Sequence, residues 1–326
     1  MNQHFQDITL KVTGATELHE IEVIQNLWSG YGKIVRYGLS SSKHESVVVK
    51  HVRLPKGGNH PRGWNTDLSH QRKVKSYEVE MAWYNNFSAK CDNSCRVPKC
   101  FGEATQSDEV LMVLEDLDAS GFAGRKTEVS WDDINACLSW LANFHATFLN
   151  TKPDGLWQVG TYWHLGTRPD ELEELSDKKL KNAAEKIDEI LSSNKYQTLV
   201  HGDAKLANFC FSKNGKGVAA VDFQYVGGGC GMKDIAYFIG SVLYEDDCER
   251  YEKQILTSYF AELKKAIDAK NITVDFDDLE REWRKMYPLA WTDFHRFLKG
   301  WSPGHWKINS YSEKMTKQVL LQIEKD

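Results

Sequence analysis

The sequence lacks two features that would point to membranes or nucleic acids. A membrane-spanning helix needs about 20 consecutive apolar residues, and no run in this chain approaches that length. There is also no excess of basic residues, because 41 Lys and Arg are set against 46 Asp and Glu. A net charge of −5 gives no overall positive field that would attract nucleic acid or an anionic membrane. We therefore expect neither kind of partner.

The sequence also lacks the cysteine pattern of a disulfide-bonded protein and the start of a secretory signal. Seven Cys among 326 residues is an odd number in a long chain, which favours reduced thiols over a disulfide framework. Cys91, Cys95 and Cys100 lie close together in the sequence, but no second Cys or His pair completes a zinc-binding pattern. Residues 1–7 combine neither the basic segment nor the apolar segment of a secretory signal. These absences predict a globular protein of the cytoplasm.

The chain does have the length and apolar content for two lobes, because 41% of its residues are hydrophobic and lobes commonly have about 100–200 residues. Its first third alternates β-rich runs with Gly and Pro turns, whereas the later part repeats apolar residues at helical intervals. We expect strands within 27–37, 45–52, 110–114, 198–200 and 218–221, and helices from 76, around 134–148, over 170–192 and beyond 234. This order predicts an α+β fold with a small sheet lobe, residues 1–114, and a larger, mostly helical lobe, residues 115–326.

The most informative part of the sequence is residues 200–211, VHGDAKLANFCF, which is followed by VDFQ at 221–224. Phosphoryl transfer from ATP requires a carboxylate that orients and deprotonates the attacking hydroxyl, and oxygen ligands that hold Mg²⁺ on the phosphates. Asp203 and Asn208, on a loop between two short strands, and Asp222, at the end of the next strand, supply these groups. The pattern favours a phosphotransferase over a set of surface turns.

These residues resemble the protein-kinase-like superfamily, and within it the aminoglycoside phosphotransferase, choline kinase and ecdysteroid-kinase-like family. The resemblance rests on HGD at 201–203, on Asn208 five residues later and on DF at 222–223, and it covers about residues 20–245. It implies a bilobal protein-kinase-like fold with a small antiparallel-sheet N-lobe and a helical C-lobe, and it implies ATP and Mg²⁺ as cofactors. By the same resemblance, Asp203 is the catalytic base, and Asn208 and Asp222 are the Mg²⁺ ligands.

Two upstream residues match further positions of this family. Lys50 follows the three valines at 47–49, and Glu80 lies in the helix expected from residue 76, where Glu78 is the competing choice. The resemblance implies that Lys50 binds the α- and β-phosphates and pairs with the helical Glu.

Other nucleotide-binding candidates come from turns. Gly30 and Gly32 form either a phosphate-covering turn or an ordinary hairpin turn. Residues 114–117, LEDL, resemble the connection between the lobes that meets adenine, which makes Glu115 a candidate. The basic stretch over 50–75 forms either a solvated face or a lid that closes on the ligand.

Two departures concern the acceptor of the phosphoryl group. Gly202 stands where protein kinases usually carry Arg, and the segment after Asp222 is short and rich in Gly. Both features favour a kinase that phosphorylates a hydroxyl of a small molecule over a protein kinase; a catalytically inactive nucleotide-binding regulator is the other alternative. Lys205 matches the lysine that neutralises the transferred phosphoryl group in protein kinases, and is either catalytic or a solvated loop residue.

The aromatic C-terminal part supplies candidates for binding the acceptor. Trp291, Asp293 and Trp301 would combine aromatic rings with a carboxylate, which suits a cationic acceptor, although Trp residues at helical spacing also commonly belong to a core.

Three further polar residues are expected to support the structure. His145 is expected to be a hydrogen-bonded core residue, and His201 to hold the backbone of the 201–208 loop. Asp234, which precedes an apolar helix, is expected to be its N-cap.

Overall fold

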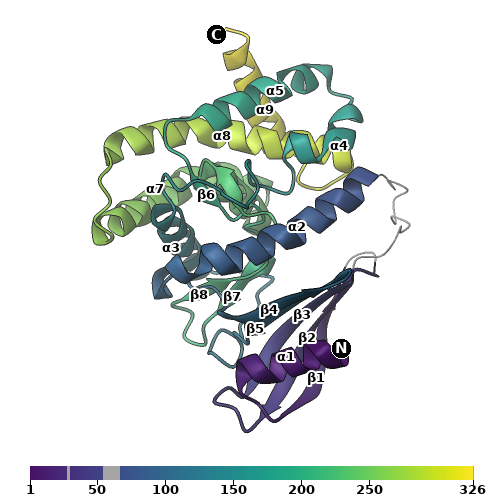
Figure 1. Ribbon diagram of the computed structural model, residues 1–326. Coiled ribbons are helices and arrows are strands. Elements are labelled where there is room, and N and C mark those ends of the chain that lie inside the picture. The colour runs from purple at the N-terminus through teal and green to yellow at the C-terminus, as the bar shows by residue number, and fades with distance from the viewer. Residues whose placement is uncertain (28–29, 54–66, 326) are drawn as a thin grey trace.

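The computed structural model describes residues 1–27, 30–53 and 67–325, and it consists of a sheet followed by a helical part (Figure 1). Residues 54–66 of the predicted lid lie outside the described residues. Helix α1 (Gln3–Thr13) precedes a five-stranded antiparallel sheet with the order β1-β2-β3-β5-β4. The strands are β1 (Glu17–Asn26), β2 (Gly32–Ser40), β3 (Ser46–Arg53), β4 (Cys100–Gln106) and β5 (Glu109–Glu115).

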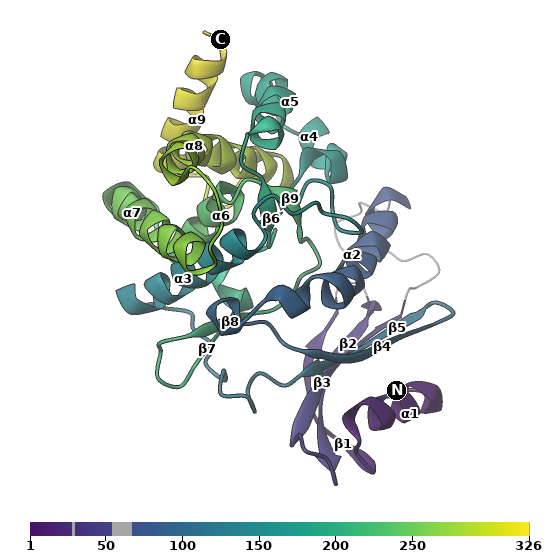
Figure 2. The same cartoon turned by 60° about the vertical axis from the view of Figure 1, so that its left-hand side comes forward.

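The sheet carries apolar side chains on both faces, because successive residues of a strand point to opposite sides. On β5, Leu111 packs in a cluster with Phe5 of α1. The neighbouring Met112 belongs to the main core, together with Val79 and Trp83 of α2 (Asp67–Asn86). The sheet is therefore covered by α1 on one face and by α2 on the other, as Figure 2 shows.

The helical part contains α3 to α9 and four short strands. The helices are α3 (Trp131–Thr147), α4 (Pro169–Glu173), α5 (Lys178–Ser193), α6 (Met232–Val242), α7 (Glu245–Ala269), α8 (Phe276–Trp301) and α9 (Ser310–Ile323). The strands pair antiparallel, β6 (Thr198–Val200) with β9 (Gly227–Gly229) and β7 (Phe209–Phe211) with β8 (Val218–Ala220). Residues 201–208 lie between β6 and β7, and residues 221–226 lie between β8 and β9, so both sequence motifs are on loops that these strands hold.

Helix α2 lies between the sheet and the helical part (Figures 1 and 2). Its Trp83 is fully buried and stacks on Phe223, with ring centroids 4.5 Å apart. Phe223 also contacts the ring of His201 at 4.7 Å. Because Phe223 follows Asp222, and Glu80 lies about one turn before Trp83, this aromatic contact fixes the position of Glu80 relative to Asp222.

The order of the elements confirms the predicted α+β class, but several bounds differ from the prediction. Helix α1 was not predicted from the sequence, and α2 begins at residue 67 rather than 76. The helix predicted over 170–192 is two helices, α4 and α5, because Leu175 turns into the core between them and Asp177 caps α5 by accepting a hydrogen bond from the Leu180 N–H. Strand β5 ends at Glu115, and the lobe boundary between residues 114 and 115 stays a prediction.

Two further findings concern the chain as a whole. Within the described ranges, no helix combines the length and the apolar content that a membrane span requires. All seven Cys side chains are free thiols.

We expect Trp83→Ala to lower the free energy of unfolding by about 3–5 kcal/mol, because it removes a fully buried aromatic side chain and leaves Phe223 without its stacking partner. Urea unfolding measures the change. The control is Leu321→Ala on α9, whose side chain is 48% exposed and whose loss changes the stability by no more than about 0.5 kcal/mol. Equal stability of the two variants would contradict the role given to this contact.

Candidate active site

The described residues enclose one large cleft between the sheet, α2 and the helical part, with a volume of about 1320 Å³. Small-molecule pockets usually measure about 300–1,000 Å³, so this cleft has room for two ligands side by side. Its lining brings together residues from far apart in the sequence, namely Lys50, Glu80, Asp203, Lys205, Asn208 and Asp222.

Lys50 and Glu80 form a buried ion pair. Lys50 is on β3 and Glu80 on α2, and the Lys50 Nζ lies 2.6 Å from Glu80 Oε2, with both side chains at most 4% exposed. Burial raises the pKa of Glu80, and the Lys50 ammonium partly offsets that rise. The competing candidate, Glu78, is exposed and pairs with Lys75 instead. The pair places one ammonium group in the cleft and holds it by a carboxylate behind it.

Asp203 lies at the centre of the loop between β6 and β7. Its Oδ2 accepts hydrogen bonds from Lys205 Nζ at 2.8 Å and from Asn208 Nδ2 at 3.1 Å. The same Asn208 amide nitrogen donates to the Asp203 carbonyl oxygen at 2.8 Å. Burial raises the pKa of Asp203, and the nearby Asp222 carboxylate adds to the rise, while the Lys205 ammonium opposes it.

Asp234 of α6 binds the backbone of the 201–208 loop, which corrects the capping role predicted for it. Its two carboxylate oxygens accept hydrogen bonds from the backbone N–H groups of His201, at 2.6 Å, and Gly202, at 2.9 Å. The N-cap of α6 is Gly231, and no side chain caps the helix. The capping prediction was wrong although Asp is a common N-cap residue. In the folded chain the Asp234 carboxylate lies next to the backbone N–H groups of His201 and Gly202, which are far from it in the sequence.

The two histidines have the supporting roles that the sequence predicts. His145 is fully buried, and its ring nitrogens contact the Tyr259 hydroxyl at 2.8 Å and the Asp234 carboxylate at 3.1 Å. His201 accepts a hydrogen bond from the Asp203 N–H on Nδ1, so its Nε2 carries the proton donated to the Val221 carbonyl oxygen at 3.0 Å. These bonds connect the loop to the strand end that leads to Asp222.

Asp222 is held in an uncommon backbone conformation. Its φ is +70°, in the left-handed region that non-glycine residues seldom adopt. Burial favours a higher pKa, but the ammonium groups of Lys50, Lys205 and Lys73 outweigh it and lower the pKa of the carboxyl group below its ordinary value. Asp222 is therefore a partly buried carboxylate whose ionised form is stabilised by three cations.

The donors in the cleft suit a magnesium ion. Asp203 Oδ1 and Asp222 Oδ1 are buried and have no hydrogen-bond partner among the described residues, and such oxygens are costly to leave unpaired. Asn208 binds Asp203 through its amide nitrogen, which leaves its amide oxygen as a further donor. Carboxylate and amide oxygens are the ligands that Mg²⁺ prefers. No group of three or more His, Cys, Asp or Glu side chains placed to hold a metal occurs in the described parts of the chain, so one carboxylate with one amide is the donor set to consider.

Lys73 is a cleft residue that the sequence analysis did not identify as a site residue. It lies two turns before Glu80 on α2, and its Nζ donates to Gln224 Oε1 at 2.9 Å. Burial, together with repulsion from Lys50, lowers the pKa of Lys73 to about 8. The sequence signals for it are its place in the basic stretch over 50–75 and its spacing from Glu80 on one helix face.

The remaining nucleotide-binding candidates predicted from the sequence are Gly30, Gly32 and Glu115. The described lining residues include Tyr31 but neither Gly30 nor Gly32. Gly32 has φ +123°, and a Cβ there would collide with the carbonyl oxygen of His51, so its glycine is required by the pairing with β3. Glu115 lines the cleft, but its carboxylate binds Arg96 and its backbone N–H donates to the carbonyl oxygen of Lys99.

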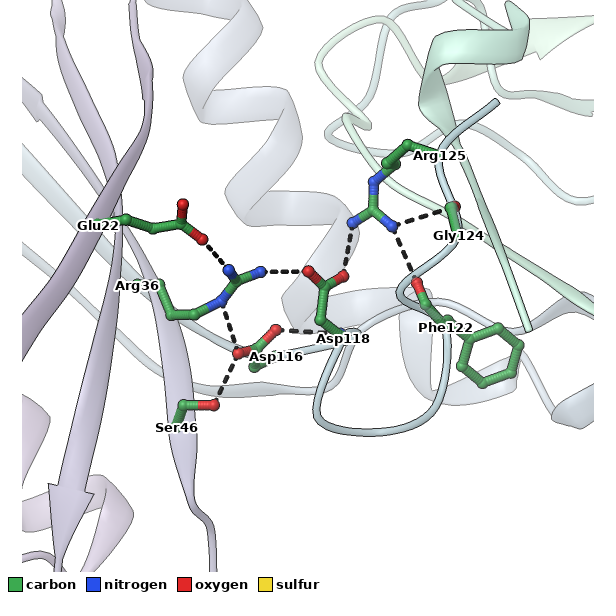
Figure 3. A network of polar contacts seen from close by, with 8 residues as sticks. All are labelled: Glu22, Arg36, Ser46, Asp116, Asp118, Phe122, Gly124 and Arg125. Carbon is green, nitrogen blue, oxygen red and sulfur yellow. Dashed lines mark hydrogen bonds and ion pairs between the residues drawn. The ribbon is translucent and has the colours of Figure 1, made fainter. Parts of the chain in front are cut away.

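A charged network joins the sheet to the segment that follows β5, residues 116–125, which we call the linker (Figure 3). The Arg36 guanidinium of β2 contacts Asp116 at 2.8 Å and Asp118 at 2.5 Å, and it also pairs with Glu22 of β1. Arg125 continues the network by binding Asp118 at 2.9 Å. Backbone hydrogen bonds between residues 124 and 211 attach the far end of the linker to β7. The two parts of the molecule are therefore joined by ion pairs at one end and by backbone pairing at the other.

We name the side of the cleft formed by α6, the end of α8 and nearby loops the C-terminal wall. It contains Tyr162, Arg168, Tyr237, Phe294, Phe297, Leu298, Trp301, His305 and Lys307.

Of the three predicted acceptor residues, only Trp301 belongs to this wall. Trp291 lies away from the cleft and donates to Ser312 Oγ at 3.0 Å. Asp293 is 1% exposed, and its carboxylate pairs with Arg296 at 2.8 Å and accepts from the Trp163 indole. The cage of Trp291 and Asp293 predicted for a cationic acceptor is therefore not formed.

Comparisons with known proteins concern the sequence and the overall fold. The sequence profile of the ecdysteroid kinase-like family matches residues 36–155 and 156–272. No curated protein matches the sequence.

Three solved structures have similar folds. An amicoumacin kinase in complex with AMP-PNP, Ca²⁺ and Ami has a TM-score of 0.55 at 14% identity, over 98% of this chain and 93% of that chain. A Plasmodium vivax ethanolamine kinase has a TM-score of 0.51 at 13% identity, over 92% and 81% of the two chains. A microcompartment-associated aminopropanol kinase has a TM-score of 0.50 at 13% identity, over 98% and 94%. At these identities the likeness establishes the fold, and it confirms the predicted bilobal class.

We expect Asp234→Ala to lower the free energy of unfolding by at least about 2 kcal/mol, because two buried backbone N–H groups lose their acceptor and each costs about 1–3 kcal/mol. Asp234→Asn keeps one acceptor oxygen and loses less. Urea unfolding measures both, with Asp268→Ala, at an exposed position of α7, as the control. A stability of Asp234→Ala within about 0.5 kcal/mol of the control would rule out this role.

Proposed function

This chain belongs to the ecdysteroid kinase-like family, a family of small-molecule kinases, and from the side chains that meet in its cleft we propose that it transfers the γ-phosphoryl group of ATP to a hydroxyl group of a small molecule. One observation carries the proposal: the Lys50–Glu80 ion pair, Asp203, Asn208 and Asp222 line the same cleft, and two of these carboxylates keep an unpartnered buried oxygen. Each of these features suits phosphate, metal or hydroxyl binding.

Lys50 and Lys73 serve the phosphates of the nucleotide. Both ammonium groups lower the pKa of Asp222, so they lie within electrostatic reach of the carboxylate that would hold the cation. Glu80 keeps Lys50 extended across the cleft. Asn208 and Asp222 would hold Mg²⁺, which neutralises phosphate charge when it is bound.

Asp203 serves the acceptor. Its free Oδ1 accepts the hydrogen bond, and then the proton, of the acceptor hydroxyl. The acceptor oxygen forms a bond to the γ-phosphorus while the bond from that phosphorus to the β,γ-bridging oxygen breaks, and ADP leaves. Lys205, which lies 2.8 Å from the other Asp203 oxygen, stabilises the negative charge of the transferred group.

Two observations support a small acceptor over a protein. A Cβ at Gly202 would collide with the carbonyl oxygen of Tyr225, so this loop has no space for the Arg that protein kinases place there. Only residues 223–226 separate Asp222 from β9, which leaves no long segment on which a peptide would lie. The presence of Lys50, Asp203, Asn208 and Asp222 in the cleft supports a catalytically active kinase rather than an inactive nucleotide-binding regulator.

We expect ATP with Mg²⁺ to raise the melting temperature, and Asp222→Asn to abolish the part of the shift that depends on Mg²⁺. Saturation at about 100 times Kd adds about 2.7 kcal/mol, or about 4 °C for 326 residues. Asn is chosen because it tolerates the positive φ of residue 222. The matched control is Asp268→Asn on the exposed face of α7. No stabilisation of the wild type by ATP with Mg²⁺ would remove the nucleotide site from the proposal.

We expect Asp203→Asn to reduce phosphoryl transfer by about 10²–10⁴-fold, the usual contribution of a general base, and to leave the ATP-induced melting shift in place. Transfer is measured as ADP release over a panel of hydroxylated small molecules. Retained turnover in Asp203→Asn would exclude Asp203 as the base.

A further inference from the structure

We propose that the acceptor of this kinase carries an anionic group, a carboxylate, sulfate or phosphate, in addition to its hydroxyl, and that Lys307 and Arg168 bind that group on the C-terminal wall. The inference rests on the proposed function, because it names the class of molecule that occupies the acceptor side of the same cleft.

The wall is largely aromatic. Tyr162 packs edge-on against Tyr237 and against Phe297, each at 5.5 Å, and Phe297 stacks on Trp301 at 5.7 Å. Burial raises the pKa of the Tyr237 hydroxyl, and the nearby Asp203 carboxylate adds to the rise. The aromatic surface therefore reaches the catalytic loop, where an apolar body of an acceptor would lie beside Asp203.

Lys307 is the cation of this wall that lies close to the most aromatic rings. It belongs to the loop between α8 and α9, and its Nζ lies 5.4–5.7 Å from the ring centroids of Tyr237, Phe294 and Trp306. In the described part of the chain, no carboxylate forms an ion pair with it. Burial, together with repulsion from Lys205, lowers the pKa of Lys307 to about 8. Such a cation gains most from a ligand that brings its own negative charge.

Arg168 approaches the same aromatic surface from another element. Its guanidinium carbon lies 6.0 Å from the Tyr162 ring and 5.6 Å from the Phe297 ring. Its Nε donates to the carbonyl oxygen of Tyr162, and its Nη1 pairs with Glu171. These bonds fix the guanidinium of Arg168, which lines the cleft. Figure 1 shows α4, which Arg168 precedes, beside the end of α8, which leads to the loop of Lys307.

The charge of the wall distinguishes acceptor classes. Its nine described residues include Arg168 and Lys307 and no carboxylate. Two carboxylates lie next to the wall, and both are paired, Glu171 with Arg168 and Asp203 with Lys205. An amine acceptor would meet repulsion from Lys307, whereas an anionic acceptor would pair with Lys307 and give Arg168 a second partner.

The γ-phosphate of ATP is the other possible source of this negative charge. Lys50 and Lys73 are held at the α2 side of the cleft by Glu80 and Gln224, whereas Lys307 lies among the rings of Tyr237, Phe294 and Trp306. This placement assigns Lys307 to the acceptor rather than to the nucleotide.

The test uses three probes with one scaffold and different charges: para-(hydroxymethyl)benzoate, its primary amide and para-(hydroxymethyl)benzylamine. Ligand-observed NMR titration of the full chain without nucleotide gives each Kd, so the result does not depend on turnover. We expect the benzoate to bind at least about tenfold more tightly than the other two, a difference of about 1.4 kcal/mol. Lys307→Met and Arg168→Met should each remove most of this preference, and Lys307→Arg should keep it.

The control for lost charge is Lys314→Met on α9, an exposed residue outside the cleft that pairs with Glu249. It should bind all three probes as the wild type does. Equal affinity for the three probes, tighter binding of the amine, or no benzoate binding at its solubility limit would overturn the proposal. So would a Lys307→Met variant that loses the ATP-induced melting shift, because Lys307 would then serve the γ-phosphate. A wild type that prefers the benzoate but shows no ATP shift would instead count against the kinase activity alone.

Discussion

The geometry of the candidate site depends on one buried carboxylate, Asp234. It accepts hydrogen bonds from two consecutive backbone N–H groups of the loop that carries Asp203, and it contacts His145, which in turn contacts Tyr259. This chain of polar contacts connects α6, α3 and α7 to one loop. A buried anion is stable only where such donors surround it, so the loop and the helices specify each other's positions. These contacts hold the backbone next to Asp203 in place. The Oδ1 atom of Asp203 has no hydrogen-bond partner among the described residues.

Much of this site could be predicted from the sequence, because motif residues are close together and have fixed chemical roles. The pattern at 201–208 and 222–223 is sufficient to predict the family, the fold class and three residues that line the cleft, Asp203, Asn208 and Asp222. Lys50 and Glu80 followed from their positions in a β-rich run and in the next helix. These predictions needed no knowledge of how distant elements pack.

The remaining features could not be predicted because they arise from tertiary contacts between residues with no common motif. Asp234 resembled a helix cap, and only the packing of α6 beneath the loop gives it another role. Asp293 resembled a ligand for a cation, but Arg296, one turn further along α8, neutralises it inside the core. Lys307 lies in a loop between two helices, and no spacing marks it. The charge of the acceptor side therefore emerges only from the fold.

The ion pairs around Arg36 differ in how exposed their side chains are, so dissolved salt does not weaken them equally. Arg36 is 16% exposed and Asp116 only 3%, whereas Glu22 and Arg125 are about half exposed. Dissolved ions screen exposed pairs strongly and buried pairs weakly. Rising ionic strength would therefore weaken the outer contacts first and leave the Arg36–Asp116 contact largely intact. In concentrated electrolyte the polar attachment of β2 to the segment after β5 would depend mainly on this one buried pair.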